Sequence, residues 1–350
     1  MSQLSGQGKL LAFLFVSVLI VFAAIPIEAS SGSAPLKDVT LWADLLGANQ
    51  VDLKQSGQWS NLTQFQLLVV DADTTGGNFT EEAIAELKSG GTRVLSYLNL
   101  GACENNRWYW SRECEMHILA PYENYSGEFW MNVSSPSWKK AVVEQIAAPL
   151  FAKGIDGFYL DNLDIVEVFP EIDGLAEGLH TIVTGLRTQY PDALLVAQNG
   201  LAALNDTSVD GLPLWSRFHA LAHEDVFATY DFEAGRYVPQ VPERTSELVA
   251  QLRYYQERGL KIFTVDFADT ADLAHMAVDA SVAHNFTPYV GPIDLDRVVF
   301  WAYYKIIPEF PGGPIIVLTS ALLVVLLAMY ARARLFSEHL GRRLSSHYSL

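Results

Sequence analysis

Acidic and amide side chains follow short apolar segments at six places along the 350-residue chain. The six groups are Asp71 with Asp73, Asn99 with Glu104, Asp161 with Asn162 and Asp164, Gln198 with Asn199, Glu224 with Asp225, and Asp266 with Asp269. A single Asp or Asn in such a place is ordinary, because both residues favour turns and helix N-caps. Six groups together indicate a shared site, since carboxylates held close together lose hydration and repel one another.

Two kinds of chemistry use a cluster of carboxylates: oxygen coordination of a divalent metal, and glycosidic cleavage by a carboxylate pair. The histidines are scattered and form no HExxH or HxH spacing, so we expect no catalytic metal. His219 and His223 are expected to pack beside a strand. The chain also lacks a Gly-x-Ser-x-Gly elbow and a P-loop, and we expect no cofactor. These features favour glycosidic cleavage.

Aromatic side chains lie near the polar groups in the sequence. Flat apolar rings can stack on sugar faces, although core packing explains Tyr159 equally well. The Trp-Tyr-Trp run at residues 108–110 lies in a polar loop and is harder to bury completely. Further candidate rings are Trp130, Trp215, Tyr230 and Tyr237. The aromatic distribution therefore favours a carbohydrate ligand.

Alternation of β-rich and helical segments predicts a parallel sheet within a single α/β domain. Eight β-rich segments occupy residues 39–43, 66–70, 93–98, 157–160, 194–198, 220–223, 261–265 and 283–289. Helices are predicted at residues 80–88, 137–153 and 243–258, the first with Thr80 as N-cap. Eight strand-helix units predict a (β/α)8 barrel, whose carboxyl strand ends carry the function. An open doubly wound sheet is the alternative fold.

Both ends of the chain are apolar and flank the predicted domain, residues 30–305. Lys9 precedes an apolar run and small residues, which is the order of an export signal, so residues 1–29 are expected to be removed. An uncleaved anchor is the alternative. Residues 314–331 predict a membrane helix, and the arginines after it place the basic tail, residues 332–350, in the cytoplasm. A buried core helix is the alternative there. The domain is therefore expected at the cell surface, anchored to the membrane by this helix.

The composition is compatible with an extracellular domain. Cys103 and Cys114 are the two cysteines of the chain, and we predict a disulfide between them. Asn-x-Ser/Thr sequons, consistent with glycosylation, occur at Asn61, Asn78, Asn124, Asn132, Asn205 and Asn285. The net charge of -17 argues against nucleic-acid binding and is compatible with an uncharged or cationic ligand.

Residues 306–313 contain Pro308, Glu309 and Phe310 directly before the predicted membrane helix. With the arginines that follow the helix, this arrangement resembles the archaeal PEF sorting signal. The resemblance implies an archaeal surface protein that a sortase-like membrane protease processes.

The strand-end motifs also resemble a known enzyme family. They read YLNLGACE at residues 97–104, GIDGFYLDN at 154–162, AQNG at 197–200, AHEDVF at 222–227, VDF at 265–267 and TPY at 287–289. The chain resembles glycoside hydrolase family 114, the endo-α-1,4-polygalactosaminidases. The resemblance implies a (β/α)8 barrel that cleaves α-linked amino-sugar polymers, with Asp161 as nucleophile and Glu224 as acid/base. We assign substrate binding to Asp71, Tyr97, Asn99, Glu104, Arg107, Trp110, Tyr159, Asn162, Asn199 and Asp266.

Three functional hypotheses follow from these observations. The first is an endo-acting glycosidase whose partner is a surface polysaccharide. The second is a carbohydrate-binding surface protein that keeps the barrel and its cleft without turnover. The third, a metal-dependent hydrolase or deacetylase, needs histidine ligands near the strand ends. The presence of both Asp161 and Glu224 favours the first hypothesis, because cleavage needs one ionised and one protonated carboxyl group.

Overall fold

A computed structural model describes residues 34–123, 125–206 and 210–299. The predicted signal peptide, the PEF-like segment 306–313, the membrane helix 314–331 and the basic tail lie outside these residues. None of the helices within the described ranges is both long and apolar enough to cross a membrane.

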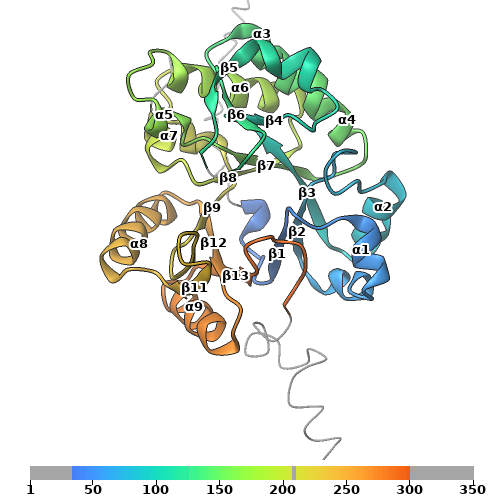
Figure 1. Ribbon diagram of the computed structural model, residues 1–350, viewed down its shortest axis with the longest axis vertical. Helices are drawn as coiled ribbons and strands as arrows, with labels where there is room; N and C mark the ends of the chain where they lie inside the picture. The colour runs from blue at the N-terminus through green and yellow to red at the C-terminus, as the bar shows by residue number, and fades with distance from the viewer. Residues whose placement is uncertain (1–33, 124, 207–209, 300–350) are drawn as a thin grey trace, which may run out of the picture. The chain divides into compact units, whose positions relative to one another are not determined.

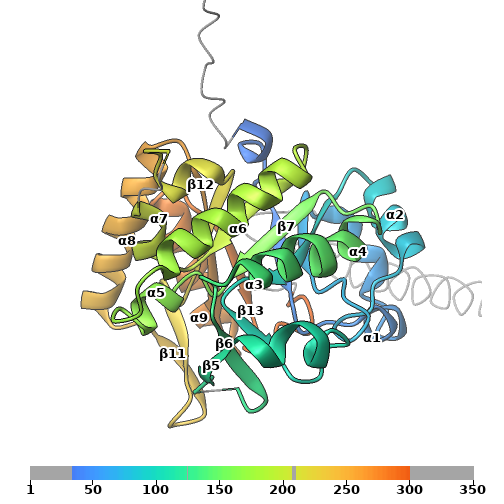
Figure 2. The same ribbon diagram turned by 90° about the horizontal axis from the view of Figure 1, so that it is seen from above.

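Eight parallel strands form the central sheet, in the order in which they occur along the chain. They are β1 (Trp42–Leu45), β2 (Leu67–Val70), β3 (Arg93–Asn99), β7 (Gly157–Asp161), β8 (Leu194–Gln198), β9 (Ala220–Glu224), β12 (Lys261–Phe267) and β13 (Thr287–Gly291). The two outer strands meet, because Trp42 Nε1 of β1 donates to the Thr287 carbonyl of β13 at 3.0 Å. The sheet is thus a nearly closed barrel of the TIM type (Figures 1 and 2). A doubly wound sheet would instead reverse its strand order at a switch point.

Helices surround the strands, as Figures 1 and 2 show. They are α1 (Gln50–Gln55), α2 (Glu81–Ser89), α3 (Pro136–Lys140), α4 (Ala147–Phe151), α5 (Ile165–Val168), α6 (Leu175–Gln189), α7 (Leu201–Asn205), α8 (Pro242–Glu257) and α9 (Ala271–Ala283). Thr80 caps α2 as predicted, since its hydroxyl accepts a hydrogen bond from the Ala83 amide at 3.2 Å. The predicted helix at residues 137–153 consists of α3 and α4 joined by a π-helical turn at Ala141–Ile146.

Two strands differ from their predicted positions. The first was expected at residues 39–43, but β1 is Trp42–Leu45, because the Thr40 and Leu41 amides donate to the Gln66 side chain rather than to a strand. The last was expected at 283–289, but β13 is Thr287–Gly291. Ala283 is still the last residue of α9, and residues 284–286 form the turn that follows it, where the His284 amide donates to the Ser281 carbonyl.

Aromatic rings fill the lower part of the barrel interior. The Trp42 ring lies 4.7 Å from Phe263, 5.9 Å from Tyr289 and 6.5 Å from Tyr159, between ring centroids. These rings come from four strands, so they point inward. Because side chains alternate along a strand, the residue two positions beyond each ring also faces inward, nearer the carboxyl end of the barrel. Asp161, two residues after Tyr159, is therefore placed above this layer.

Two β-structured excursions leave the barrel after β3 and β9 and were not predicted from the sequence. The first is a three-stranded antiparallel sheet of β4 (Ala102–Glu104), β5 (Ile118–Pro121) and β6 (Glu128–Met131). The second is the hairpin of β10 (Ala228–Asp231) and β11 (Arg236–Pro239). Figure 2 shows β5, β6 and β11 on the same side of the barrel. Both excursions start at carboxyl strand ends, where a barrel carries its functional loops.

Candidate active site

A cleft of about 810 Å³ lies at the carboxyl ends of the strands. The strand register explains why polar side chains meet there. Tyr97 pairs with Tyr159 and Asn99 with Asp161, so the inward faces of β3 and β7 continue together past the aromatic layer. Most of the predicted site residues line this cleft, namely Asp71, Tyr97, Glu104, Arg107, Asp161, Asn162, Asn199 and Glu224.

Asp161 is half-buried at the end of β7 and accepts hydrogen bonds at both carboxylate oxygens. The Tyr97 hydroxyl lies 3.0 Å from Oδ2, and the Asn162 amide donates to Oδ1 at 2.7 Å. The direction of the Tyr97 bond follows from Asn99, whose Nδ2 donates to the Tyr97 hydroxyl oxygen at 2.9 Å. Asn99 is itself oriented by the Ala102 amide, which donates to its Oδ1 at 2.7 Å. This chain of donors stabilises the ionised form of Asp161.

Glu224 is half-buried at the end of β9 and is held by Asn199. The backbone amide of Glu224 donates to Asn199 Oδ1 at 3.1 Å, which fixes the orientation of the Asn199 side chain. The Asn199 Nδ2 then donates to Glu224 Oε2 at 2.9 Å. Asn199, assigned to substrate binding from the sequence, thus also positions the second carboxylate.

The residues that directly follow the two carboxylates have left-handed backbone conformations. Asn162 has φ of 57°, and Asp225 also has φ of 57°. Asn and Asp tolerate this region better than other residues with a side chain. Gly101 lies against the Asn162 turn, and a Cβ there would come within 2.1 Å of the Asn162 carbonyl oxygen. These turns stop each strand at its carboxylate and lead the chain away from the cleft.

The electrostatics of the cleft favour a proton on one of the two carboxyl groups, Asp161 or Glu224. Burial raises the pKa of Asp161 well above its ordinary value, and the charge of Glu224 raises it further. Burial also raises the pKa of Glu224, to about 7, although the hydrogen bond from Asn199 lowers it. One ionised carboxylate therefore disfavours ionisation of the other. Each carboxyl group has two hydrogen-bond donors: the Tyr97 hydroxyl and the Asn162 amide for Asp161, and the Asn199 and Gln198 side chains for Glu224.

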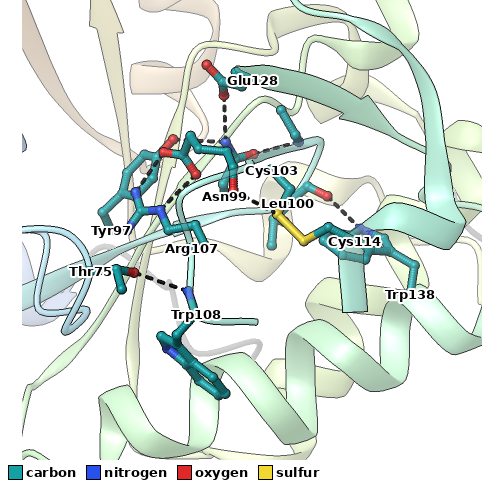
Figure 3. The surroundings of a disulfide bond; sticks show 12 residues. Thr75, Tyr97, Asn99, Leu100, Cys103, Arg107, Trp108, Cys114, Glu128 and Trp138 are labelled. Atoms are coloured by element: carbon teal, nitrogen blue, oxygen red, sulfur yellow. Dashed lines mark hydrogen bonds and ion pairs between the residues drawn. A yellow bond between two sulfur atoms is a disulfide. The ribbon is translucent and has the colours of Figure 1, made fainter. Parts of the chain in front are cut away.

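Arg107 joins two carboxylates in the wall of the cleft. Its guanidinium donates to Asp71 at 2.7 Å and to both oxygens of Glu104, at 2.9 Å and 2.6 Å. The arginine side chain is 8% exposed and that of Asp71 5% exposed, so this pairing is buried. Figure 3 shows Arg107 beside Tyr97, whose ring centroid lies 6.0 Å from the guanidinium carbon. All these residues were assigned to substrate binding from the sequence, and the structure brings them together.

Glu128 is a cleft residue that the sequence does not predict. It begins β6, lines the cleft, and accepts a hydrogen bond from Asn99 Nδ2 at 3.1 Å (Figure 3). Burial raises the pKa of Glu128 to about 7, and the nearby Glu104 raises it as well. Because β6 belongs to the excursion after β3, no strand-end pattern in the sequence marks this residue.

Aromatic side chains from the two excursions stand on the walls of the cleft. Tyr122 and Tyr125 precede β6, whereas Tyr230 and Phe232 come from the β10–β11 hairpin. Tyr125 is 51% exposed and Phe232 is 56% exposed. Of these four rings, Tyr230 is a candidate predicted from the sequence. Exposed rings beside polar groups are surfaces on which a sugar face can stack.

Besides the buried Asn99, three predicted substrate residues do not line the cleft. Tyr159 is fully buried in the aromatic layer of the barrel. Asp266 is fully buried, and its Oδ1 accepts from the amides of Phe227 and Ala228 at 2.6 Å and 2.9 Å, so it holds the start of the β10 excursion. Trp110 packs against Phe129, with ring centroids 5.1 Å apart. These three side chains do not line the cleft. The sequence indicates where a strand ends but not how deep a side chain lies in the barrel, so the prediction included them.

The predicted disulfide between Cys103 and Cys114 is present (Figure 3). It ties β4 to the π-helical turn Trp110–Cys114, and both cysteines are buried. Trp108 in the closed loop is 41% exposed, and its indole nitrogen donates to Asp73 at 2.8 Å. The disulfide therefore secures the loop that carries Arg107.

No group of three or more His, Cys, Asp or Glu side chains within the described ranges is arranged to hold a metal ion. His223 is buried, and its Nδ1 lies 2.6 Å from the Glu224 carbonyl oxygen. Burial lowers the pKa of His223 to about 4. The chemistry that the arrangement supports is proton transfer and nucleophilic attack by carboxyl groups.

Comparisons with known proteins identify the family and the fold. An uncharacterized protein of Deinococcus radiodurans is 25% identical over 284 residues, which cover 79% of this chain and 87% of that protein. The glycoside hydrolase domain of PelA from Pseudomonas aeruginosa has a similar fold, with a TM-score of 0.60, 20% identity and coverage of 74% of this chain and 97% of that domain. Aspergillus fumigatus Ega3, solved in complex with galactosamine, gives a TM-score of 0.53 at 15% identity, with coverage of 74% and 93%. The sequence model of glycoside-hydrolase family GH114 matches residues 40–306. The chain therefore belongs to family GH114 and is a glycosidase.

Proposed function

We propose that this glycosidase cleaves α-linked amino-sugar polysaccharide, with Asp161 as nucleophile and Glu224 as acid/base. The observation that carries the proposal is the placement of the two carboxylates in one cleft with different partners. Burial raises the pKa of both groups, that of Glu224 to about 7, and we assign the proton of the pair to Glu224 and the charge to Asp161, which accepts from the Tyr97 hydroxyl and from a backbone amide. These are the states that attack and proton donation require.

The proposed reaction has two steps. The Asp161 carboxylate attacks the anomeric carbon as the bond to the leaving oxygen breaks, and the Glu224 proton passes to that oxygen. Glu224, now ionised, then takes a proton from water while the water oxygen displaces Asp161 from the sugar. Asn199 keeps Glu224 oriented throughout, and Tyr97 stabilises the Asp161 carboxylate when it leaves.

The charge of the cleft supports a cationic sugar as substrate. Among the described residues that line it, Arg107 is the single Lys or Arg side chain, and two of the surrounding carboxylates already pair with it. Glu128, Asp164 and Asp225 also line the cleft. An ammonium group would form charge-assisted hydrogen bonds with such carboxylates. The galactosamine in the Ega3 structure, a neighbour in fold, supports this chemistry.

The test is release of reducing ends from deacetylated and acetylated α-1,4-galactosaminoglycan by the full chain. We expect turnover of the deacetylated polymer and its loss by at least about a hundredfold in Asp161→Asn and Glu224→Gln, in line with the usual effect of general acid–base groups. Asp269→Asn is the matched control, since Asp269 also follows a barrel strand but is exposed and does not line the cleft.

Two results would separate the remaining hypotheses. Binding of a polysaccharide panel without turnover of any member would replace the enzyme proposal with the carbohydrate-binding one. Turnover that survives in both variants would leave the enzyme but refute the assigned pair. Proton NMR of the first-formed product anomer checks the two-step mechanism, which predicts retention of the α configuration.

We also propose that the protein is exported and remains on the cell surface, held by the segment 314–331. The support is the order of charged, apolar and small residues at both ends of the sequence. Resistance of the membrane-bound protein to alkaline extraction checks the anchor. Mass spectrometry of the mature C-terminus checks processing by a sortase-like protease after the PEF-like segment.

A further inference from the structure

A second hollow of about 830 Å³ adjoins the cleft on the side of Glu224. We call it the α7–α8 groove, because residues of these two helices form much of its walls. In Figures 1 and 2 both helices lie on the same side of the barrel, and the Tyr255 hydroxyl of α8 donates to the Leu201 carbonyl of α7 at 2.6 Å. Its volume lies within the range of roughly 300–1,000 Å³ that is typical of ligand sites. Apart from Asn199 and Glu224, which also line the cleft, no residue of this groove takes part in the proposed catalytic steps.

The groove and the cleft share part of their walls. Asp164, Asn199, Glu224 and Asp225 line both hollows. The cleft extends from Glu224 toward Asp161, Asp71 and the β6 excursion, whereas the groove extends from Glu224 along α8. Glu224, the group that protonates the leaving oxygen, thus stands where the two meet. In the proposed reaction the leaving part of the polymer lies next to Glu224, and Glu224 borders the groove as well as the cleft.

The groove is lined by the same kinds of side chain as the cleft, namely carboxylates, amides and aromatic rings. Tyr254 of α8 is 37% exposed, and Arg258 lies against its ring at 3.3 Å from the centroid. Glu167 and Glu247 add carboxylates to those that the groove shares with the cleft, and Gln251 adds an amide. Arg244, the cation of the lining, is paired with Glu247 at 3.0 Å, with both side chains about half exposed. An aromatic ring among acidic and amide groups suits a cationic sugar unit.

We propose that the α7–α8 groove binds the leaving-group part of the polysaccharide, with Tyr254 as a stacking surface and Glu247 and Gln251 as polar contacts. This inference rests on the proposed function, because it assigns the groove to the same polymer. The groove then sets how chain length affects cleavage, while the carboxylate pair performs the chemistry. A substrate too short to extend past Glu224 does not contact the α7–α8 groove, so the groove does not raise its kcat/KM.

The test compares Tyr254→Ala, Tyr254→Phe and Glu247→Gln with wild type on short and long oligosaccharides of deacetylated α-1,4-galactosaminoglycan. We expect Tyr254→Ala to lower kcat/KM for long substrates roughly three- to tenfold, the equivalent of one aromatic stacking contact, and to leave short substrates unchanged. Tyr254→Phe keeps the ring and should behave as wild type. Glu243→Gln is the control for Glu247→Gln, since Glu243 lies one turn earlier on α8, is exposed and does not line the groove.

Binding gives a readout that does not depend on turnover. In an Asp161→Asn background, Tyr254→Ala should weaken binding of the long polymer by a similar factor, as measured by affinity electrophoresis. Equal kcat/KM and equal binding for Tyr254→Ala and wild type on long substrates would overturn the groove assignment while the proposed function stands. Equal losses on short and long substrates would also overturn it, since they would indicate a general disturbance near Glu224.

Discussion

Replacing Arg107 by methionine should cost far more stability than replacing a comparable surface arginine. Arg107 is 8% exposed and holds Asp71, 5% exposed, together with Glu104. Removing one partner of a buried ion pair leaves an uncompensated charge and costs about 3–5 kcal/mol. Arg93 provides the control, because it also pairs with a carboxylate, Asp38, but the two side chains are 31% and 62% exposed. Exposed pairs contribute about 0–1 kcal/mol.

Equilibrium urea unfolding of Arg107→Met and Arg93→Met, followed by tryptophan fluorescence, measures this difference. The decrease in the free energy of unfolding caused by Arg107→Met should become smaller at acidic pH. Burial raises the pKa of Asp71, and Arg107 counteracts this rise. Without Arg107 the ionised Asp71 destabilises the folded state more, and its pKa is higher. Protonation of Asp71 at acidic pH therefore removes part of the destabilisation. A loss below about 1 kcal/mol at neutral pH, or one equal to that of Arg93→Met, would refute the reading of Arg107 as the buried centre of the cleft wall.

Three further predictions follow from the site. Activity needs Glu224 protonated, so kcat/KM should fall as the pH rises through about 7. Asn199→Ala should move this fall to a pH about one to two units higher, because the hydrogen bond that stabilises the Glu224 carboxylate is lost. A pH–rate profile of Asn199→Ala in which kcat/KM falls at a lower pH than in wild type would contradict the role of Asn199. Asp44 is fully buried, and burial raises its pKa well above the ordinary value, so it destabilises the fold increasingly as the pH rises above about 4. Asp44→Asn should therefore raise the melting temperature at neutral pH and have less effect near pH 4, and a lower Tm at pH 7 would count against this. Replacing Cys103 and Cys114 together by serine should cost about 2–4 kcal/mol in urea unfolding, and a change below about 1 kcal/mol would show that the loop is held by its other contacts.

Short apolar segments that end in polar residues carried most of the fold prediction. β7 and β9 read as strands in the sequence because they are apolar and bounded by glycine or polar residues, and their ends place Asp161 and Glu224 at one face of the barrel. The Thr80 cap was equally readable, since it depends on a hydrogen bond between residues three apart. These are local patterns, and the order of parallel strands then converts them into a shared site.

The tertiary structure alone decided which polar and aromatic residues meet in the cleft. Glu128 reaches Asn99 because the chain returns after β4, and such antiparallel pairing joins residues whose spacing no local pattern marks. The sequence likewise placed Tyr159 and Asp266 at strand ends. Their burial depends on how far up the barrel each side chain lies, which is set by the register between neighbouring strands. The sequence thus determined the strands and the two carboxylates that end them, whereas packing across the barrel determined the walls around those carboxylates.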